Sequence, residues 1–364
     1  MQCFRILATT LIFGATVVCQ VTEPSALSAA INGPSALAVY KNYLFVLEAV
    51  PARLLRIDLQ HGTLRVMAGN GKRCCRRDGV KGTQSILDGP FSLAVDSQGN
   101  VFIGEVTGTV RRLDAGTGII TTIVGDGIAG DTQEGAQAPS AHFWSVDSLA
   151  IDSKDNLYIA DNHQEKIFKV DRQTNIVTTF AGNGKHGFSG DGQLATHGSF
   201  RFLGITFDSS DDLVIADYEN CRIRFIDGGT SLLKTVAVVA PVAADGTCAN
   251  PSTAPGPYPS DPATDADNNI YFVEGAFDVV VKISASTGEM STFAGQTQMG
   301  GFSGDGGPAD AAKLANPSGL AFDEAGNLYI AEYVNNRIRK VDGKTHRIST
   351  VAGNGLPHRI DIEL

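Results

Sequence analysis

The stretch from Asn316 to Gly355 reads NPSGLAFDEAGNLYIAEYVNNRIRKVDGKTHRISTVAGNG and contains four short apolar runs separated by turns. The runs are LAFD, LYIAE, IRKVD and ISTVAG, with turn residues such as Gly326-Asn327 and Gly343-Lys344 between them. Val, Ile, Phe and Tyr dominate these runs, and none of them has the helical period of about 3.6 residues. The stretch therefore predicts a four-stranded antiparallel meander.

A similar pattern occurs six times along the chain, and each copy carries a carboxylate at the end of its second apolar run. The six carboxylates are Glu48, Glu105, Asp161, Asp217, Glu274 and Glu332, at spacings of 57, 56, 56, 57 and 58 residues. A fixed period of this length indicates one supersecondary unit repeated. A lone meander exposes an apolar face on each side, so six of them must pack face to face around an axis. We therefore predict an all-β fold, a six-bladed β-propeller.

Three segments resemble a known family of repeats. GLAFDEAGNLYIAEYVNNRIRKVD (319–342) and SLAIDSKDNLYIADNHQEKIFKVD (148–171) resemble NHL repeats, and AGNGKHGFSGDGQLA (181–195) resembles the loop between blades in secreted and teneurin-like members of that superfamily. The resemblance extends over nearly all of the chain after its first residues. The resemblance implies the propeller fold. It implies no single function, because members of the superfamily include protein-binding and RNA-binding modules, receptor sensor domains and a few metal-dependent lyases.

The first residues have the pattern of a secretory signal. An apolar stretch at 6–18 follows MQCFR and is too short to span a bilayer. We expect residues 1–19 to be a signal peptide and residues 20–364 to form the propeller, although small residues around Ser28 and Ala29 offer a later cleavage site. The protein is then secreted, or periplasmic in a bacterium. No later stretch is long and apolar enough for a transmembrane helix.

The composition excludes several classes of protein. Hydrophobic residues make up 43% of the 364 residues and charged residues 19%, which is typical of a packed globular chain. The formal charge is −10, and nucleic-acid binding needs clustered Lys and Arg, so we expect no nucleic-acid partner. The one dense basic patch, at residues 72–77, fits an exposed loop tip. We expect a monomer.

Four cysteines follow the predicted signal peptide, an even number for an oxidising compartment. A disulfide between Cys221 and Cys248 is plausible, because the two flank the outer half of one repeat. Cys74 and Cys75 are adjacent, and a disulfide between them would be strained, so they either stay free or pair elsewhere. The spacing of Cys and His does not indicate a zinc site.

The recurring carboxylates have two interpretations. For Glu48, Asp161, Asp217 and Glu332 we expect a structural role, because a basic residue follows five positions later; these residues are Arg53, Lys166, Arg222 and Arg337. In blade 2 a shorter turn places Thr109 at this position after Glu105, and in blade 5 Val279 follows Glu274; the two blades lie opposite one another in a ring of six. This pair is either a cation or amine site or simply faces water.

The mouth of the central channel is the natural pocket of a propeller. Comparable positions of the innermost strands are Ser35, Phe91, Asp147, Leu203, Ser260 and Ser318. The acidic members near this mouth are Asp147 and Asp261. His142, Trp144 and Arg201 precede the third and fourth inner strands, so they complete the set of binding candidates.

We do not predict a metal site with named ligands. The Gly-rich loops carry one aspartate each, Asp191 and Asp305, which is too few for calcium, and His142 is the one histidine near the channel. We therefore expect no cofactor, and calcium is the one alternative.

The sequence favours a binding or scaffold module over an enzyme. The ligand would be a protein, a peptide or a glycan, held by the channel mouth and by the segments that depart from the repeat, at 72–77, 131–144 and 241–260. The alternative is a metal-dependent (Ca or Zn) hydrolase or lyase with its ion in the central channel. Its ligands would come from Glu105, Glu274, Asp147 or Asp261, by analogy of fold.

Overall fold

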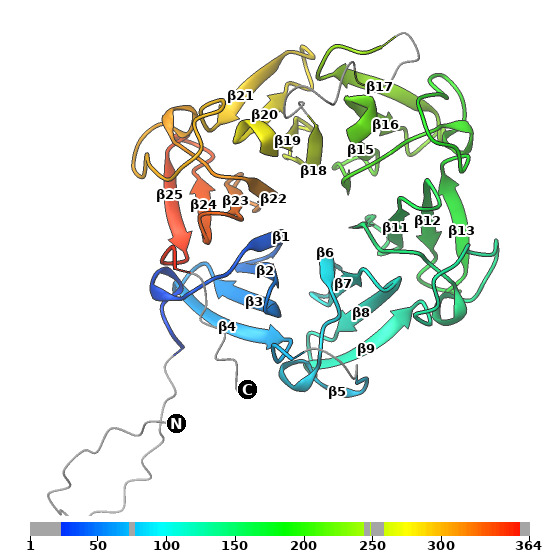
Figure 1. Cartoon of the computed structure of the whole chain (residues 1–364), viewed down its shortest axis with the longest axis horizontal. Coiled ribbons are helices and arrows are strands. Elements are labelled where there is room, and N and C mark those ends of the chain that lie inside the picture. Colours follow the sequence, from blue (N-terminus) through cyan, green and yellow to red (C-terminus); the bar gives the residue numbers. More distant parts are fainter. Residues whose placement is uncertain (1–22, 73–76, 244–247, 249–257, 357–364) are drawn as a thin grey trace, which may run out of the picture.

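A computed structural model describes residues 23–72, 77–243, 248 and 258–356 and arranges them as six blades around a central axis (Figure 1). Each blade is an antiparallel sheet whose four main strands follow one another in sequence order, with the first strand nearest the axis. The predicted all-β, six-bladed propeller is confirmed. The predicted signal peptide (1–19), Cys74 and Cys75 lie outside the described residues.

The strands of the six blades have the following bounds. Blade 1 contains β1 (Pro34–Tyr40), β2 (Tyr43–Ala49), β3 (Ala52–Asp58) and β4 (Thr63–Ala68), and blade 2 contains β6 (Pro90–Val95), β7 (Val101–Glu105), β8 (Thr109–Leu113) and β9 (Ile119–Val124), with a short β5 (Val80–Lys81) beside β9. Blade 3 contains β10 (Ser148–Ile151), β11 (Leu157–Asp161), β12 (Lys166–Val170) and β13 (Val177–Ala181), and blade 4 contains β14 (Ile205–Phe207), β15 (Leu213–Asp217), β16 (Arg222–Ile226) and β17 (Leu233–Val238). Blade 5 contains β18 (Pro259–Thr264), β19 (Ile270–Glu274), β20 (Val279–Ile283) and β21 (Met290–Ala294), and blade 6 contains β22 (Pro317–Phe322), β23 (Leu328–Glu332), β24 (Arg337–Val341) and β25 (Ile348–Ala352).

Short 3₁₀ turns are the only helical elements within these described ranges. They are η1 (Ala26–Ser28), η2 (Gly82–Gln84), η3 (Ala138–Ser140), η4 (Ala195–His197), η5 (Tyr218–Asn220), η6 (Gly275–Phe277) and η7 (Ala309–Ala311). No helix among the described residues is long and apolar enough to cross a membrane.

The second strand of each blade explains the continuous apolar runs of the sequence. Every residue of β7, β11, β15 and β23 is buried, because neighbouring blades cover both faces of the sheet. Between blades 1 and 6, for example, Leu44 and Val46 of β2 pack with Tyr329 and Ala331 of β23 in one apolar cluster. The core is therefore a set of layers between blades, and it holds the six inner strands in a ring.

Among the described residues, the first and last blades exchange no strand where the ring closes. Blade 6 consists wholly of β22 to β25, and the segment before β1 lies against it. The amide of Gly353 donates to the carbonyl of Ala26 (2.9 Å), and the amide of Gly33 donates to the side-chain oxygen of Asn336 (2.9 Å). Nearer the axis, the Ser318 hydroxyl donates to the carbonyl of Pro34 (2.7 Å).

Candidate functional site

Five of the six recurring carboxylates are completely buried at the ends of the second strands. Each accepts a hydrogen bond from a backbone amide of the segment that leads into the inner strand of its own blade. The donors are Asn32, Asp88, Trp144, Arg201 and Ala315, in blades 1, 2, 3, 4 and 6. These bonds fix the start of the inner strand in these five blades, and they define one face of the propeller, which we call the mouth face.

The side-chain partners of these carboxylates differ from those that the sequence suggested. Arg53 pairs with Glu48 at 2.6 Å, as expected. Asp161, however, accepts a hydrogen bond from the Gln164 side chain (2.8 Å) and forms no ion pair with Lys166 in the described structure. In blades 4 and 6 the carboxylate forms its ion pair with the arginine seven positions later, in the pairs Asp217–Arg224 (3.1 Å) and Glu332–Arg339 (2.9 Å). Arg222 and Arg337, five positions later, lie directly opposite these carboxylates on the neighbouring strand.

The residue seven positions after each carboxylate lies diagonally opposite it on the neighbouring strand of the same blade, and its identity determines the ion pair. In blades 4 and 6 that position holds an arginine whose side chain is fully buried and reaches the carboxylate, whereas blade 1 has Leu55 there. Burial raises the pKa of Asp217 to about 6, and the positive charge of Arg224 opposes that rise. These carboxylates therefore serve the frame of the propeller.

The buried arginines also explain the aspartates of the Gly-rich loops. Arg111, Arg224 and Arg339 pair with the aspartate of the loop that precedes their blade, and the pairs are Arg111–Asp78 (2.8 Å), Arg224–Asp191 (2.9 Å) and Arg339–Asp305 (2.6 Å). Each loop aspartate is thus bound to a guanidinium. The joint occurrence of a GDG or RDG loop and an arginine in the third strand was the sequence signal for this arrangement.

Glu105 and Glu274 have different surroundings. Glu105 is fully buried, accepts a hydrogen bond from the Thr109 hydroxyl (2.8 Å) and lies 3.7 Å from Arg111, so the expectation that it lacks a partner was wrong. Glu274 has no hydrogen bond or ion pair with any described residue, and burial raises its pKa to about 7. Neither residue lines the channel cavity.

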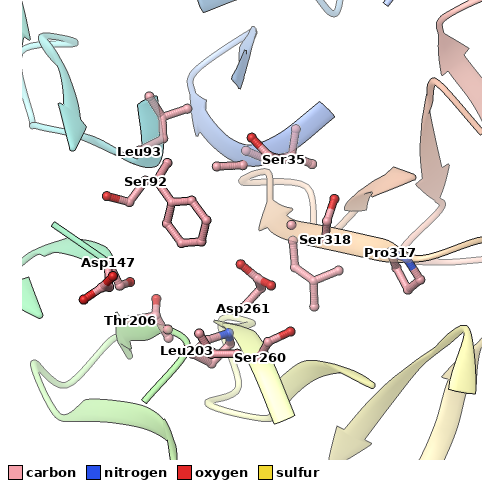
Figure 2. A pocket seen from close by; sticks show the side chains of 18 of the residues that line it. Ser35, Ser92, Leu93, Asp147, Leu203, Thr206, Ser260, Asp261, Pro317 and Ser318 are labelled. Carbon is pink, nitrogen blue, oxygen red and sulfur yellow. The ribbon is translucent and has the colours of Figure 1, made fainter. Parts of the chain in front are cut away.

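A cavity of about 380 Å³ occupies the channel where the inner strands begin, on the mouth face (Figure 2). Its rim contains the six residues that the repeat alignment placed there, namely Ser35, Phe91, Asp147, Leu203, Ser260 and Ser318. Two positions further along the strands, an apolar ring follows, made of Leu37, Leu93, Leu149, Ile205, Pro262 and Leu320. The cavity therefore has a rim that is polar at four of its six positions, and an aliphatic floor.

Asp147 and Asp261 both line the cavity. Figure 2 shows Asp261 reaching toward the middle of the cavity, with Asp147 and the serines around it. One oxygen of Asp147 accepts hydrogen bonds from the Ser145 hydroxyl and from the Asn162 amide, both at 2.8 Å. Burial raises the pKa of Asp261 to about 7, and a hydrogen bond from Ser260 opposes that rise. No Lys, Arg or His is among the described residues that line the cavity.

A displaced β-bulge puts Asp261 in this position. In blades 1, 2 and 6 the bulge falls at the second residue of the inner strand, whereas in blade 5 it falls between Ser260 and Ala263. Asp261 has a φ of +45° there. A Cβ on Gly204 of the neighbouring blade would lie 2.4 Å from Cδ of Pro262, so the glycine makes room for the bulge.

The other candidates lie on the mouth face beside the cavity. Trp144 is 45% exposed, its indole NH donates to Asp131 (3.1 Å), and its ring contacts that of His163 at 5.7 Å between centroids. Arg201 forms an ion pair with Glu219 at 3.2 Å.

His142 does not belong to a metal-binding cluster. It lies 3.2 Å from a carboxylate oxygen of Asp126. Among the residues that the structure describes, no group of three or more His, Cys, Asp or Glu could hold a metal ion.

The structure joins Cys221 to Cys248, with a Cα–Cα distance of 5.4 Å. The amide of Cys248 also donates to the carbonyl of Glu219 (3.2 Å). The bridge therefore fastens part of the segment at 241–260 to the turn between β15 and β16, on the mouth face.

Known proteins share both the repeat and the architecture. Residues 314–341 match the family model of the NHL repeat. The chain is 26% identical to protein SUPPRESSOR OF QUENCHING 1, chloroplastic, of Arabidopsis thaliana over 90% of its length, and 27% identical to teneurin-1 of Mus musculus over 76%. It spans 27% of the first protein and 9% of the second.

A solved structure described as an auxiliary nutrient binding protein of Bacteroides thetaiotaomicron superposes with a TM-score of 0.58 at 15% identity. The likeness covers 88% of this chain and 70% of the other, and at this identity it shows a shared fold alone.

Proposed function

Because this chain is an NHL-repeat β-propeller with an acidic cavity at one end of its channel, we propose that it is a binding module that docks a partner protein on its mouth face. The observation that carries the proposal is a group of exposed apolar side chains around the cavity. They are Val50, Phe91, Val106, Trp144, Tyr333 and Val334, each more than 40% exposed. Isolated exposed apolar residues are ordinary, but a group that surrounds a cavity is typical of an interaction site.

The positions of these side chains place them on one face. Val50, Val106, Tyr333 and Val334 belong to the turns that follow the buried carboxylates, and Phe91 lines the cavity rim. Aromatic side chains contribute large contact areas at small cost in conformational entropy, and they are enriched at the centres of protein interfaces. The rigid frame behind them requires little reorganisation when a partner binds.

We also propose that the protein acts outside the cell or in a periplasm. The disulfide between Cys221 and Cys248 supports this location, because disulfides persist in oxidising compartments. The apolar stretch at 6–18 supports it as well, although it lies outside the described residues.

The docking proposal can be tested by crosslinking the purified protein to the extracellular proteins of its source and identifying the products by mass spectrometry. A triple variant with Phe91→Ser, Trp144→Ser and Val334→Ser removes three apolar side chains from the mouth face. We expect the crosslinked partners to decrease by about fivefold or more, which corresponds to the loss of interface contacts worth above about 1 kcal/mol. Met290→Ser, on the equally exposed outer strand β21, is the matched control. Equal crosslinking by both variants would contradict the proposal.

A further inference from the structure

We propose that the channel cavity binds an alkylammonium group, of the kind that a lysine side chain of the partner presents. The proposal names the ligand class for the site described above, and it rests on the proposed docking function for the source of that group. Its physical basis is the match between an ammonium ion on an aliphatic chain and the two layers of the cavity.

The polar rim offers hydrogen-bond acceptors and negative charge. Asp147 and Asp261 supply carboxylates, and the hydroxyls of Ser35, Ser260 and Ser318 can accept as well. A lysine ammonium has three donors and no acceptor, so it uses such a rim fully. Because no basic side chain is among the described lining residues, the two negative charges have no cation of the protein beside them within the cavity.

The floor of the cavity suits the methylene groups of the ligand. Its ring of Leu37, Leu93, Leu149, Ile205, Pro262 and Leu320 is aliphatic. Long cationic side chains place their methylene groups along apolar surface and keep the charged end among polar groups. A volume of about 380 Å³ lies within the range of small-molecule sites, and it accommodates a short alkyl chain.

Asp261 is a specific feature of blade 5 and not part of the repeat. The same position in the other five blades holds only small residues, which are Ala36, Ser92, Ser148, Gly204 and Gly319. In blade 5 the displaced bulge turns the acid toward the channel, and Gly204 of blade 4 leaves space for it. Bulges commonly re-aim a side chain at a functional site.

A divalent metal ion fits the same lining less well. Calcium takes about six to eight oxygen ligands, usually including several carboxylates. The cavity contributes two carboxylates, and no cluster of three potential metal ligands occurs among the described residues. We therefore assign the cavity to an organic cation.

The test uses n-butylammonium as the probe, with the neutral n-butanol as its isostere, and isothermal titration calorimetry on the purified protein at pH 8. We expect n-butylammonium to bind about tenfold or more tightly than n-butanol, because only the ammonium forms charge-assisted hydrogen bonds. Asp261→Asn should weaken n-butylammonium binding by about tenfold. Asparagine tolerates a positive φ, so this variant keeps the backbone that Asp261 has.

Two further variants make the outcome decisive. Asp147→Asn should also weaken n-butylammonium, and it provides an independent reading if Asp261→Asn fails to fold. Asp267→Asn, an exposed acid in the turn between β18 and β19, removes the same charge from blade 5 and should leave binding unchanged. The proposal is overturned by equal affinity for n-butanol, by unchanged affinity in both cavity variants, by the absence of saturable binding, or by stoichiometric displacement of n-butylammonium by Ca²⁺.

This experiment is independent of partner docking. Loss of partner crosslinking in the mouth-face variant, together with no n-butylammonium binding, would retain the docking module and remove the ammonium site. Specific n-butylammonium binding without any crosslinked partner would support the cavity assignment and remove the protein partner as its source.

Discussion

Six carboxylates at one position of the repeat have different surroundings, and Glu274 is the exceptional one. The other five accept an amide hydrogen bond from a residue sixteen or seventeen positions earlier. Seventeen positions before Glu274 the sequence has Pro257, which lies outside the described residues and has no amide hydrogen to donate. The side chain is also without an ion-pair partner in the described structure, so no described residue compensates its burial.

Replacing Glu274 by glutamine should therefore stabilise the protein at pH 8. The pKa of Glu274 is raised from 4.5 to about 7, so the folded state binds more protons than the unfolded state between these values. Stability must then decrease as the pH rises through that window. We expect Glu274→Gln to raise the free energy of unfolding by about 1–2 kcal/mol at pH 8 and to have no effect at pH 4, allowing for partial exposure. Urea unfolding of the variant and the parent protein at both pH values measures this difference in the free energy of unfolding.

Glu332→Gln is the matched control at the equivalent position of blade 6. It removes the charge that faces the buried Arg339, and the loss of one partner of a buried pair costs about 3–5 kcal/mol. If the two glutamine variants changed the stability at pH 8 in the same direction, the difference in surroundings would not be the cause.

Asp261 should make n-butylammonium binding depend on pH. Its pKa of about 7 means that the carboxyl group is mostly neutral at pH 6 and mostly ionised at pH 8. The ionisable groups that share the cavity with it are Asp147 and Tyr333. We expect the affinity to increase about fivefold to tenfold from pH 6 to pH 8, as the ionised fraction rises. In Asp261→Asn the calorimetric affinity should vary little over this range, and an equal increase in the variant would contradict the assignment.

At the scale of elements, the propeller alternates between two kinds of blade. Blades 2, 4 and 6 have a buried arginine in the third strand and a preceding loop that ends in Gly-Asp-Gly or Arg-Asp-Gly. Blades 1, 3 and 5 have Leu55, Phe168 and Val281 at the corresponding position of that strand. In blades 4 and 6 the loop phenylalanine also packs on the guanidinium groups, with Phe302 lying 4.9 Å from Arg339. The Gly-rich loops therefore belong to the structural frame.

Arg339→Leu should destabilise the protein strongly. The substitution leaves Glu332 buried without its cation and removes the anchor of Asp305, so we expect a loss of about 3–5 kcal/mol in the free energy of unfolding. Leu55→Met, at the corresponding position of blade 1, is the control, and a volume-conserving exchange of this kind costs less than about 1.5 kcal/mol. Denaturant unfolding compares the two. A loss of similar size in both would mean that shape, and not the ion pairs, dominates at this position.

At the scale of the whole molecule, the sequence predicted what the repeat determines. The spacing of the carboxylates gave the number of blades, and the aligned inner strands placed Ser35, Phe91, Asp147 and their counterparts around one cavity. Residues at the same position of the repeat occupy equivalent positions around the axis, because every blade packs in the same way.

The sequence analysis did not predict the features that the repeat does not determine. Arg222 and Arg224 lie on the same face of β16 and both contact the ring of Phe188, and the choice of Arg224 depends on its reach to Asp217 and to Asp191 of a distant loop. The inward position of Asp261 depends on a bulge shifted within its strand and on a glycine in the neighbouring blade. The shifted bulge has no signal within one repeat alone, whereas the loop aspartate and the arginine of the third strand signal the ion pair only when they are considered together.

The closure of the ring depends on a short segment before β1. Ala26 and Ile31 are completely buried beside blade 6, and backbone carbonyls of Ala26 and Ala29 accept the amides of Gly353 and Asn354. Every other junction between blades has a continuous chain across it, whereas this junction has only side-by-side contacts. The segment therefore replaces a covalent link.

Shortening the chain to begin at Gly33 should open this junction, whereas a chain that begins at Glu23 should keep it. The shorter chain loses the buried Ile31 and Ala26 together with the hydrogen bonds to Gly353 and Asn354, so we expect a loss of about 3–5 kcal/mol in the free energy of unfolding. Hydrogen exchange should then accelerate first in β1 and in β22 to β25, because these strands border the gap, while blades 3 and 4 remain protected. Equal thermal stability of the two chains, or uniform loss of protection in all six blades, would mean that packing of the blade faces closes the ring without this segment.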